Sequence, residues 1–258
     1  MELNYKKIPK QIEYLYSEDN YIFICYNNKI YTFSMDTKIY PSTEINFKVS
    51  KIRLMPKDTL VIQSLNYLYY KKINDSYLAQ SKITFDKVFF SEQKIFILLK
   101  STFYYVKNVN YSIKLRELNF SLEDFIYMKG KFFFLSEGII YTCTWNTLKD
   151  NLTKIEYLSN IGIIGFINNP MGQLALVTEK EVIVNSENIR VFKKPEKCNK
   201  TLLTDKYMIF MTESLYIHCI KSGEFIKKFS ILGKGCCINY KIKYIFVLAE
   251  ALFLININ

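Results

Sequence analysis

Histidine and glycine are scarce in this chain of 258 residues, and their scarcity limits the chemistry available to it. His218 is the single histidine, so a histidine-based catalytic triad has no other residue to use. Cys219 follows it directly, and adjacent strand residues point to opposite faces, which places the two poorly for a nucleophile–base contact. Eight glycines make a phosphate-cradling loop a poor expectation, and no P-loop, G-x-G-x-x-G, G-x-S-x-G or H-E-x-x-H motif occurs. Carboxylates converging on a central channel are the remaining route to hydrolysis. We expect no enzymatic activity, no cofactor and no small-molecule substrate.

Cysteine pairs with metal-ligand spacing are also missing. The six cysteines include no C-x-x-C pair and no Cys/His ligand pattern, which predicts buried, reduced thiols and no metal site.

The N-terminal residues 1–7 lack the apolar stretch of a signal peptide. No uncharged apolar run reaches the roughly 18 residues that a membrane-spanning helix needs. We expect an intracellular protein, cytoplasmic or nuclear, without membrane insertion.

Alanine, the strongest helix former, occurs four times, whereas the chain holds 21 tyrosines and 20 phenylalanines. This bias favours β-strands throughout. No linker rich in proline, glycine or serine interrupts the chain, so we expect residues 1–258 to form a single domain.

A short unit recurs seven times along the sequence. Each copy has an apolar strand, a polar break of two or three residues and a second strand. The second strands begin at Lys29, Tyr67, Phe103, Ile139, Glu181, Leu215 and Ala251. The mean spacing is 37 residues. A period near 40 residues with four strands per unit is typical of a β-propeller, and seven units account for the chain. The sequence therefore predicts an all-β, seven-bladed β-propeller with four-stranded blades.

The first unit shows the expected plan of a blade. Residues 12–16, 21–26 and 29–33 are predicted strands, Asn27-Asn28 is a tight hairpin turn, and a fourth strand is predicted near Ile39. The second and third strands of later units form predicted hairpins at residues 59–73, 94–106, 131–144, 173–185, 207–220 and 244–257.

The last unit supplies three strands, and a spare strand precedes the first unit. We expect the segment 2–8 to pair with residues 252–257 and so complete the seventh blade. Closure of the ring has a physical motive, because unpaired strand edges promote aggregation.

One blade resembles a WD40 repeat in its motif. Residues 215–229, LYIHCIKSGEFIKKF, are similar to the third strand, turn and fourth strand of that family. Ser222-Gly223 matches the family's turn, and His218-Cys219 stands where the family has Trp-Asp. Residues 30–40 resemble the same stretch more weakly. The resemblance implies a divergent WD40-like propeller, although no blade has the family's Gly-His pair and other seven-bladed families fit the repeat as well.

The charge is strongly basic, with 35 basic and 24 acidic residues and a net charge of +11. Several lysines fall in predicted connections between the fourth strand of one blade and the first strand of the next. We predict a basic arc on the rim that binds a partner, formed by Lys7, Lys10, Lys193, Lys194, Lys197, Lys200 and Lys234. The turns at Glu137, Glu179, Glu213 and Glu250 are predicted to lie on the same side, nearer the axis. The alternative is that these charged loop residues only keep a lysine-rich protein in solution.

These features favour a scaffold that holds one or more proteins in a multiprotein complex, because the many loops of a rigid ring present a broad surface. The alternative is an accessory subunit for RNA modification or ribosome assembly that contacts RNA through the basic rim. Only Arg53, Arg116 and Arg190 are arginines, which favours the protein partner, because base and phosphate recognition prefers the planar arginine fork.

Overall fold

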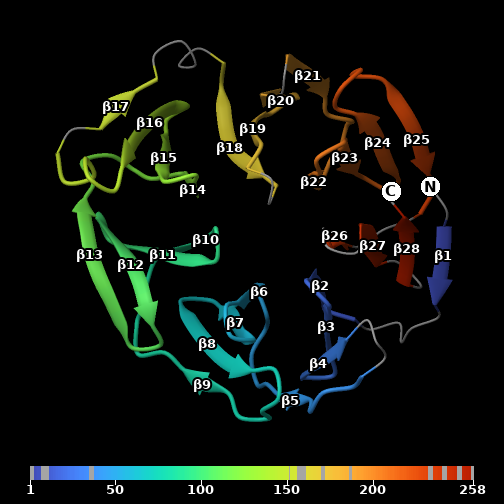
Figure 1. Ribbon diagram of the computed structural model, residues 1–258, viewed down its shortest axis with the longest axis horizontal. Coiled ribbons are helices and arrows are strands. Elements are labelled where there is room, and N and C mark those ends of the chain that lie inside the picture. Colours follow the sequence, from blue (N-terminus) through green and yellow to red (C-terminus); the bar gives the residue numbers. More distant parts are fainter. Residues whose placement is uncertain are drawn as a thin grey trace.

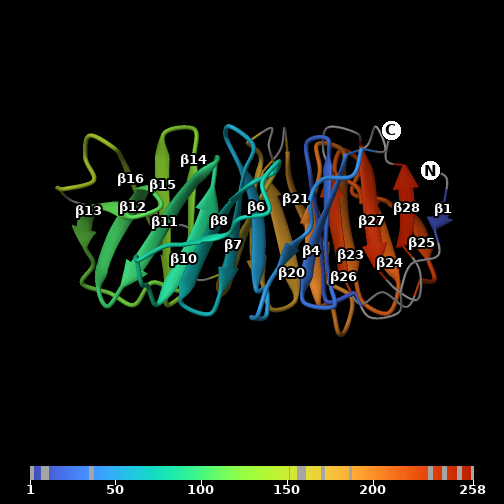
Figure 2. The same cartoon turned by 90° about the horizontal axis from the view of Figure 1, so that it is seen from below.

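The computed structural model describes residues 3–6, 12–34, 38–150, 152–155, 161–169, 172–185, 188–231, 235–239, 243–248 and 252–256. Within these ranges the chain forms seven four-stranded antiparallel sheets and no helix. The sheets surround a common axis like the blades of a propeller (Figure 1), and the ring is a flat disc when seen from the side (Figure 2). The predicted seven-bladed β-propeller is confirmed. None of the described segments is a helix that could cross a membrane.

Blades 1 to 4 each use four consecutive strands, which follow one another from the axis outward. Blade 1 consists of β2 (Tyr14–Glu18), β3 (Tyr21–Tyr26), β4 (Lys29–Ser34) and β5 (Thr43–Glu44). Blade 2 consists of β6 (Lys51–Met55), β7 (Thr59–Ser64), β8 (Tyr67–Lys72) and β9 (Ala79–Gln80). Blade 3 consists of β10 (Lys87–Ser91), β11 (Lys94–Leu99), β12 (Thr102–Asn108) and β13 (Tyr111–Glu117). Blade 4 consists of β14 (Asp124–Met128), β15 (Lys131–Ser136), β16 (Ile139–Thr144) and β17 (Thr153–Lys154).

Blades 5 and 6 follow the same plan, and blade 7 joins the two ends of the chain. Blade 5 consists of β18 (Ile163–Asn168), β19 (Leu174–Thr178), β20 (Glu181–Asn185) and β21 (Ile189–Lys193). Blade 6 consists of β22 (Lys200–Leu203), β23 (Tyr207–Met211), β24 (Leu215–Cys219) and β25 (Phe225–Phe229). Blade 7 consists of β26 (Gly235–Asn239), β27 (Tyr244–Leu248), β28 (Leu252–Asn256) and β1 (Leu3–Lys6).

The predicted hairpins agree closely with the observed strands. Asn27 and Asn28 form the turn between β3 and β4 with positive φ angles of 49° and 55°, as a tight hairpin turn of this kind requires. The prediction of a fourth strand near Ile39 was wrong. Ile39 makes an isolated bridge to Phe33, and the fourth strand β5 lies further along. Pro41 separates the two because it has no N–H to donate to the ladder.

A packed cluster between blades 3 and 4 is rich in aromatic side chains. Phe96 is fully buried, and its ring stacks on Phe103 at a centroid distance of 5.6 Å. The rings of Phe125 and Phe132 lie 5.0 and 5.8 Å from that of Phe96. Strand alternation brings these side chains to facing sides of two sheets, so the phenylalanine-rich sequence becomes the core between neighbouring blades.

Polar side chains accept hydrogen bonds from backbone N–H groups on the inner strands β6 and β18. In β6, the amide N–H groups of Ile52 and Leu54 donate to Tyr14 Oη (3.3 Å) and Glu18 Oε2 (3.1 Å) of the preceding blade. Phe166 N likewise donates to Asp124 Oδ2 at 2.8 Å. These polar residues therefore link adjacent blades where no strand pairs with the inner edge.

The N-terminal strand completes blade 7, as the sequence predicted. Residues Leu3 to Lys6 of β1 pair antiparallel with Leu252 to Ile255 of β28. Blade 7 is also tied to blade 1, because the buried side chain of Asn239 donates from Nδ2 to Ser17 Oγ (2.7 Å) and to the Asp19 carbonyl oxygen (2.9 Å). Both ends of the chain thus take part in one closed ring.

Candidate functional site

Four of the seven predicted partner-binding lysines lie on the path from the outer strand of blade 5 to the inner strand of blade 6. Lys193 ends β21, Lys194 and Lys197 lie in the connection, and Lys200 begins β22. Lys200 is therefore on an inner strand and not on the outer rim, because this connection runs from the outside of one blade to the inside of the next. Lys7, Lys10 and Lys234 lie outside the described residues.

The connection is held against the blade 5 hairpin turn. Lys194 N donates to the Lys180 carbonyl oxygen at 2.7 Å, and Lys194 Nζ donates to the Thr178 carbonyl oxygen at 3.1 Å. Glu179 is exposed in the same turn. The predicted proximity of basic connections and acidic turns is thus observed for Lys194 and Glu179. Glu137 and Glu213 are exposed in the corresponding turns of blades 4 and 6, and Glu250 lies outside the described residues.

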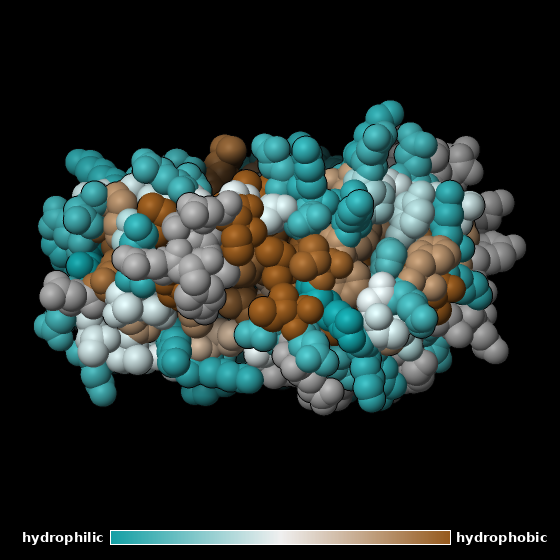
Figure 3. All heavy atoms as spheres, turned by 90° about the horizontal axis from the view of Figure 1, so that it is seen from above, coloured by the Kyte–Doolittle hydropathy of each residue, from teal (hydrophilic) through white to brown (hydrophobic). Residues whose placement is uncertain are grey.

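The outer strand of blade 5 exposes apolar side chains next to the predicted lysines. Ile189 and Val191 are 72% and 55% exposed, and strand alternation puts them on the same face as the exposed Lys193. Figure 3 shows apolar atoms gathered in the middle of the side of the disc where blade 5 lies. The surface of β21 formed by Ile189, Val191 and Lys193, which we name the β21 face, joins apolar area to positive charge. Sequence reasoning missed the apolar part, because alternating apolar residues in a strand usually indicate core.

A cleft of about 350 Å³ opens between the inner strands of blades 5 and 6. Lys194 and Lys200 both line it, together with Ile164 and Gly165 of β18 and Thr201 of β22. Lys200 Nζ also donates to the Cys236 carbonyl oxygen of blade 7 at 2.5 Å. The ammonium group of Lys200 therefore reaches toward blade 7, whereas that of Lys194 lies against blade 5.

Charged groups from three blades influence one another near the axis. Burial lowers the pKa of Lys51 to about 8, with further lowering by the charges of Arg53 and Lys200 and an opposing effect from Asp124. Lys51 Nζ lies 5.3 Å from the centroid of the Phe90 ring, and the Arg53 guanidinium lies 4.9 Å from that of Tyr16. The inner strands therefore hold cations in a partly desolvated setting.

Lys51 gives the stability of the protein a distinct pH dependence. Its folded pKa, about 8, is below the ordinary 10.5, so the unfolded chain binds more protons between these values and stability rises with pH across that window. We expect Lys51→Met to raise the free energy of unfolding at pH 7 by about 1–2 kcal/mol, after allowance for solvent screening. The gain should fall as the pH rises from about 8 to 10.5, because the folded protein has then lost a proton that the unfolded chain still holds. Urea titrations of both proteins from pH 7 to 10.5 test this, with the exposed Lys107→Met as the control; an equal gain at every pH would contradict it.

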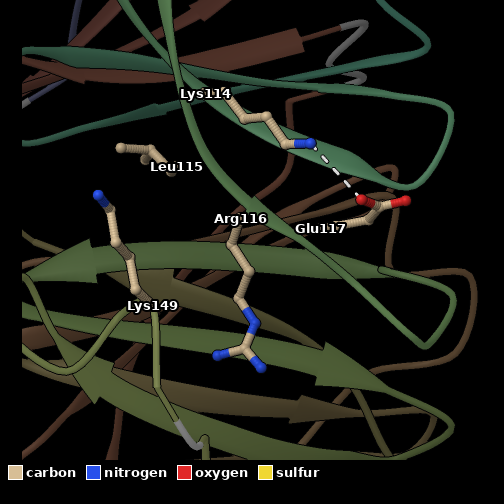
Figure 4. Close-up of a pocket in the computed structure, with 5 residues that line it drawn as sticks. All are labelled: Lys114, Leu115, Arg116, Glu117 and Lys149. Carbon is tan, nitrogen blue, oxygen red and sulfur yellow. Dashed lines mark hydrogen bonds and ion pairs between the residues drawn. The ribbon is translucent and has the colours of Figure 1, made fainter.

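A second hollow, of about 400 Å³, lies on the outer strand of blade 3 and is lined by Lys114, Leu115, Arg116, Glu117 and Lys149 (Figure 4). Arg116 Nη1 donates to the carbonyl oxygens of Leu148 (3.1 Å) and Asp150 (2.8 Å) in blade 4. Lys114 turns toward Glu117, with a Nζ–Oε2 distance of 3.5 Å (Figure 4). Arg116 thus joins blades 3 and 4, whereas Lys114 and Glu117 pair with each other within β13.

His218 has a structural environment in blade 6. Its ring meets those of Phe192, Phe210 and Phe225 edge to face at centroid distances of 5.5–6.0 Å, and burial lowers its pKa. Cys219 has a lowered pKa because Ser222 hydrogen-bonds to its sulfur. The predicted turn at Ser222-Gly223 is present, with a φ of 81° at Gly223. In the part of the chain that the structure describes, no group of three His, Cys, Asp or Glu residues is arranged to hold a metal ion.

Comparison with known proteins identifies the fold class. No protein-family model and no curated protein sequence matches the chain. The extracellular domain of a putative one-component system from B. thetaiotaomicron is similar over 96% of this chain, with a TM-score of 0.69 and 10% identity. PorZ, a bacterial surface component of the type-IX secretion system of Porphyromonas gingivalis, is similar over 97%, with a TM-score of 0.66 and 12% identity. The match spans 40% and 37% of those two longer chains.

A third similar structure has nearly the same length as this chain. KlHsv2, with its loop 6CD replaced by a Gly-Ser linker, gives a TM-score of 0.64 and 11% identity, and the match covers 93% of this chain and 89% of that one. At these identities the likeness defines the class of protein, a seven-bladed β-propeller, and nothing narrower. The likeness of residues 215–229 to a WD40 repeat stays a prediction.

Proposed function

We propose that this propeller is a non-catalytic scaffold that holds an acidic protein partner within a larger assembly. The β21 face carries the proposal, because exposed Ile189 and Val191 lie beside Lys193 on one outer strand. Apolar area rimmed by charge is typical of protein-interaction surfaces. Positive charge at its edge favours a partner whose own rim is acidic.

Two further observations support a structural role for Asp124 and His218, whose side chains could otherwise suggest catalysis. The carboxylate of Asp124 accepts backbone N–H groups from Phe166 and Phe125, both at 2.8 Å. The ring of His218 is surrounded by aromatic side chains. The six cysteines, all free thiols, support an intracellular location as part of the same proposal.

The proposal is tested by isolating tagged protein from its source cells at physiological salt, with and without RNase, and identifying partners by mass spectrometry. We expect a stoichiometric partner that survives RNase. Replacing Ile189 and Val191 by serine, or Lys193 and Lys197 by glutamate, should lower its recovery at least about tenfold, because central apolar contacts and rim charges act together.

The matched control is a double charge reversal at Lys57 and Lys107, which are exposed in blades 2 and 3, with blade 4 between them and blade 5 (Figure 1). This variant has the same net charge as the Lys193/Lys197 variant and should keep the partner. Unchanged recovery of the partner with both the serine and the glutamate variants would overturn the proposal. Partners lost on RNase treatment would instead favour RNA bound by the lysines.

A further inference from the structure

The outer edge of β21 carries backbone groups that no neighbouring strand uses. β21 is the last strand of the blade 5 sheet, and within the residues that the structure describes no strand pairs with its outer side. Lys194 N donates to the Lys180 carbonyl oxygen at 2.7 Å, in register with the ladder between β20 and β21. Hydrogen-bonded and non-hydrogen-bonded pairs alternate along an antiparallel ladder, so the N–H and C=O groups of Ile189, Val191 and Lys193 point away from β20. The open backbone groups therefore belong to the same residues as the β21 face.

Among the outer strands of the seven blades, β21 is the best suited to accept another strand. The outer strands β5, β9 and β17 have two residues each, and β1 has four. Register shifts interrupt the pairing of β13 and of β25 with the strands beside them. β21 has five residues, and all of them pair with β20 without a shift. Short length and bulges are common means by which an edge strand avoids further pairing, and β21 has neither.

The two faces of β21 are covered differently. Phe192 is buried, and its ring centroid lies 6.0 Å from that of His218 in blade 6. Strand alternation therefore turns Ile189 and Val191 toward blade 4, on the other side of blade 5 (Figure 1). The outer strand of blade 4, β17, has only two residues, and Ile189 and Val191 remain 72% and 55% exposed. An added strand could thus pack apolar side chains against that face.

The charge around β21 favours an acidic segment. The stretch 189–197 contains four basic residues and one acidic residue, namely Arg190, Lys193, Lys194, Lys197 and Glu196. Glu181 lies opposite Lys193 in the ladder, but the two form no ion pair in the described part of the chain. The basic residues are thus available to carboxylates of a partner. A second copy of this chain suits the edge less well, because two molecules with a net charge of +11 repel each other.

We propose that β21 accepts an extended, acidic segment of the partner protein as a fifth strand of blade 5. The partner is the one assigned above to the β21 face, so this proposal rests on the scaffold function. Hydrogen bonds to the open backbone groups of β21 supply affinity in this mode of binding, and alternate side chains of the added strand supply specificity. Apolar residues of the segment face Ile189 and Val191, and its carboxylates approach Lys193 and the lysines that follow.

A short fluorescent peptide that alternates valine with glutamate is the probe, and fluorescence anisotropy measures its binding to the intact chain. The peptide should bind, and a version with lysine in place of glutamate should bind at least about tenfold more weakly. N-methylation of either the valine amides or the glutamate amides gives two isomers, which block opposite edges of the added strand. One isomer should bind like the parent peptide and the other at least about tenfold more weakly, because only one edge can face β21.

Val191→Pro and Val191→Ala form a matched pair of variants. Both remove the branched side chain, but only proline removes the N–H group that points away from β20. Proline is tolerated in an edge strand where that group faces solvent, so both variants should fold, as circular dichroism can verify. The proline variant should bind the peptide and recover the cellular partner at least about tenfold less well than the alanine variant.

Equal binding of the two N-methylated isomers, or no binding of the parent peptide, would overturn the inference. These measurements use the wild-type chain, so they do not depend on how the proline variant folds. Equal binding by folded proline and alanine variants would also overturn it, as would self-association through β21 detected by light scattering, which would make a second copy the occupant.

The two proposals can fail separately. If the serine variant of Ile189 and Val191 loses the cellular partner while both N-methylated isomers bind equally, the scaffold function stands and strand addition is wrong. If one isomer alone binds but no stoichiometric partner is recovered from cells, strand addition stands and the scaffold function is wrong.

Discussion

Deletion of residues 1–6 is expected to open the propeller and to lower Tm by about 10 °C. The deletion removes β1, whose four residues pair with β28 in blade 7. At about 0.5–1.5 kcal/mol for each lost backbone hydrogen bond, the cost is about 2–5 kcal/mol, and each kcal/mol lowers Tm by about 2–4 °C in a chain of this size. The uncovered edge of β28 should also promote self-association.

Thermal unfolding followed by circular dichroism and sizing by light scattering measure both effects. A synthetic peptide of residues 1–9, added in trans, is the control, because it should refill the vacant edge and restore both Tm and the monomer. If the shortened protein kept the Tm of the full chain and stayed monomeric, closure of the ring by β1 would be contradicted.

Phe96→Ala should be among the most damaging single substitutions. Phe96 is fully buried and contacts the rings of Phe103, Phe125 and Phe132. Truncation of a buried phenylalanine costs about 3–5 kcal/mol, because lost transfer energy and the remaining cavity add together. Equilibrium urea unfolding should show this loss as a lower midpoint at an unchanged slope.

A surface phenylalanine provides the matched control. Phe225 is 54% exposed on the outer strand of blade 6, and Phe225→Ala should cost less than about 1 kcal/mol. Phe96→Leu should fall between the two, since it keeps most of the buried volume. Similar losses for Phe96→Ala and Phe225→Ala would show that the aromatic cluster does not dominate blade packing.

Local sequence patterns were sufficient to predict the two middle strands of each blade. The turn at Asn27-Asn28 and the hairpins of blades 2 to 7 followed from alternating apolar residues and polar breaks, which are local properties of the chain. The closure by residues Leu3 to Lys6 followed from counting strands in a ring that must hide its edges. The prediction of a fourth strand near Ile39 was wrong, because Pro41 cannot donate to the ladder and the strand forms only at Thr43–Glu44.

The candidate sites were predicted only in part, because they depend on how blades meet. The lysines of the blade 5–6 connection were found, but nothing local indicated that Lys200 would reach blade 7 or share a cleft with Ile164. The exposure of Ile189 and Val191 was also missed, since their alternation is the same as that of buried strand residues. The charges of Asp124 in blade 4 and Lys200 in blade 6 shift the pKa of Lys51 in blade 2. No spacing in the sequence reveals this interaction.

The amino-acid sequence by itself determined that this protein is a closed ring of seven four-stranded blades. Period, turn residues and strand formers act within about 40 residues, the length of one blade, and each can be read without knowledge of the others. Only the tertiary structure decided which lysines lie on the outer face, which line the cleft and which approach the axis. Those positions follow from packing between blades, where residues far apart in sequence determine one another's burial and charge.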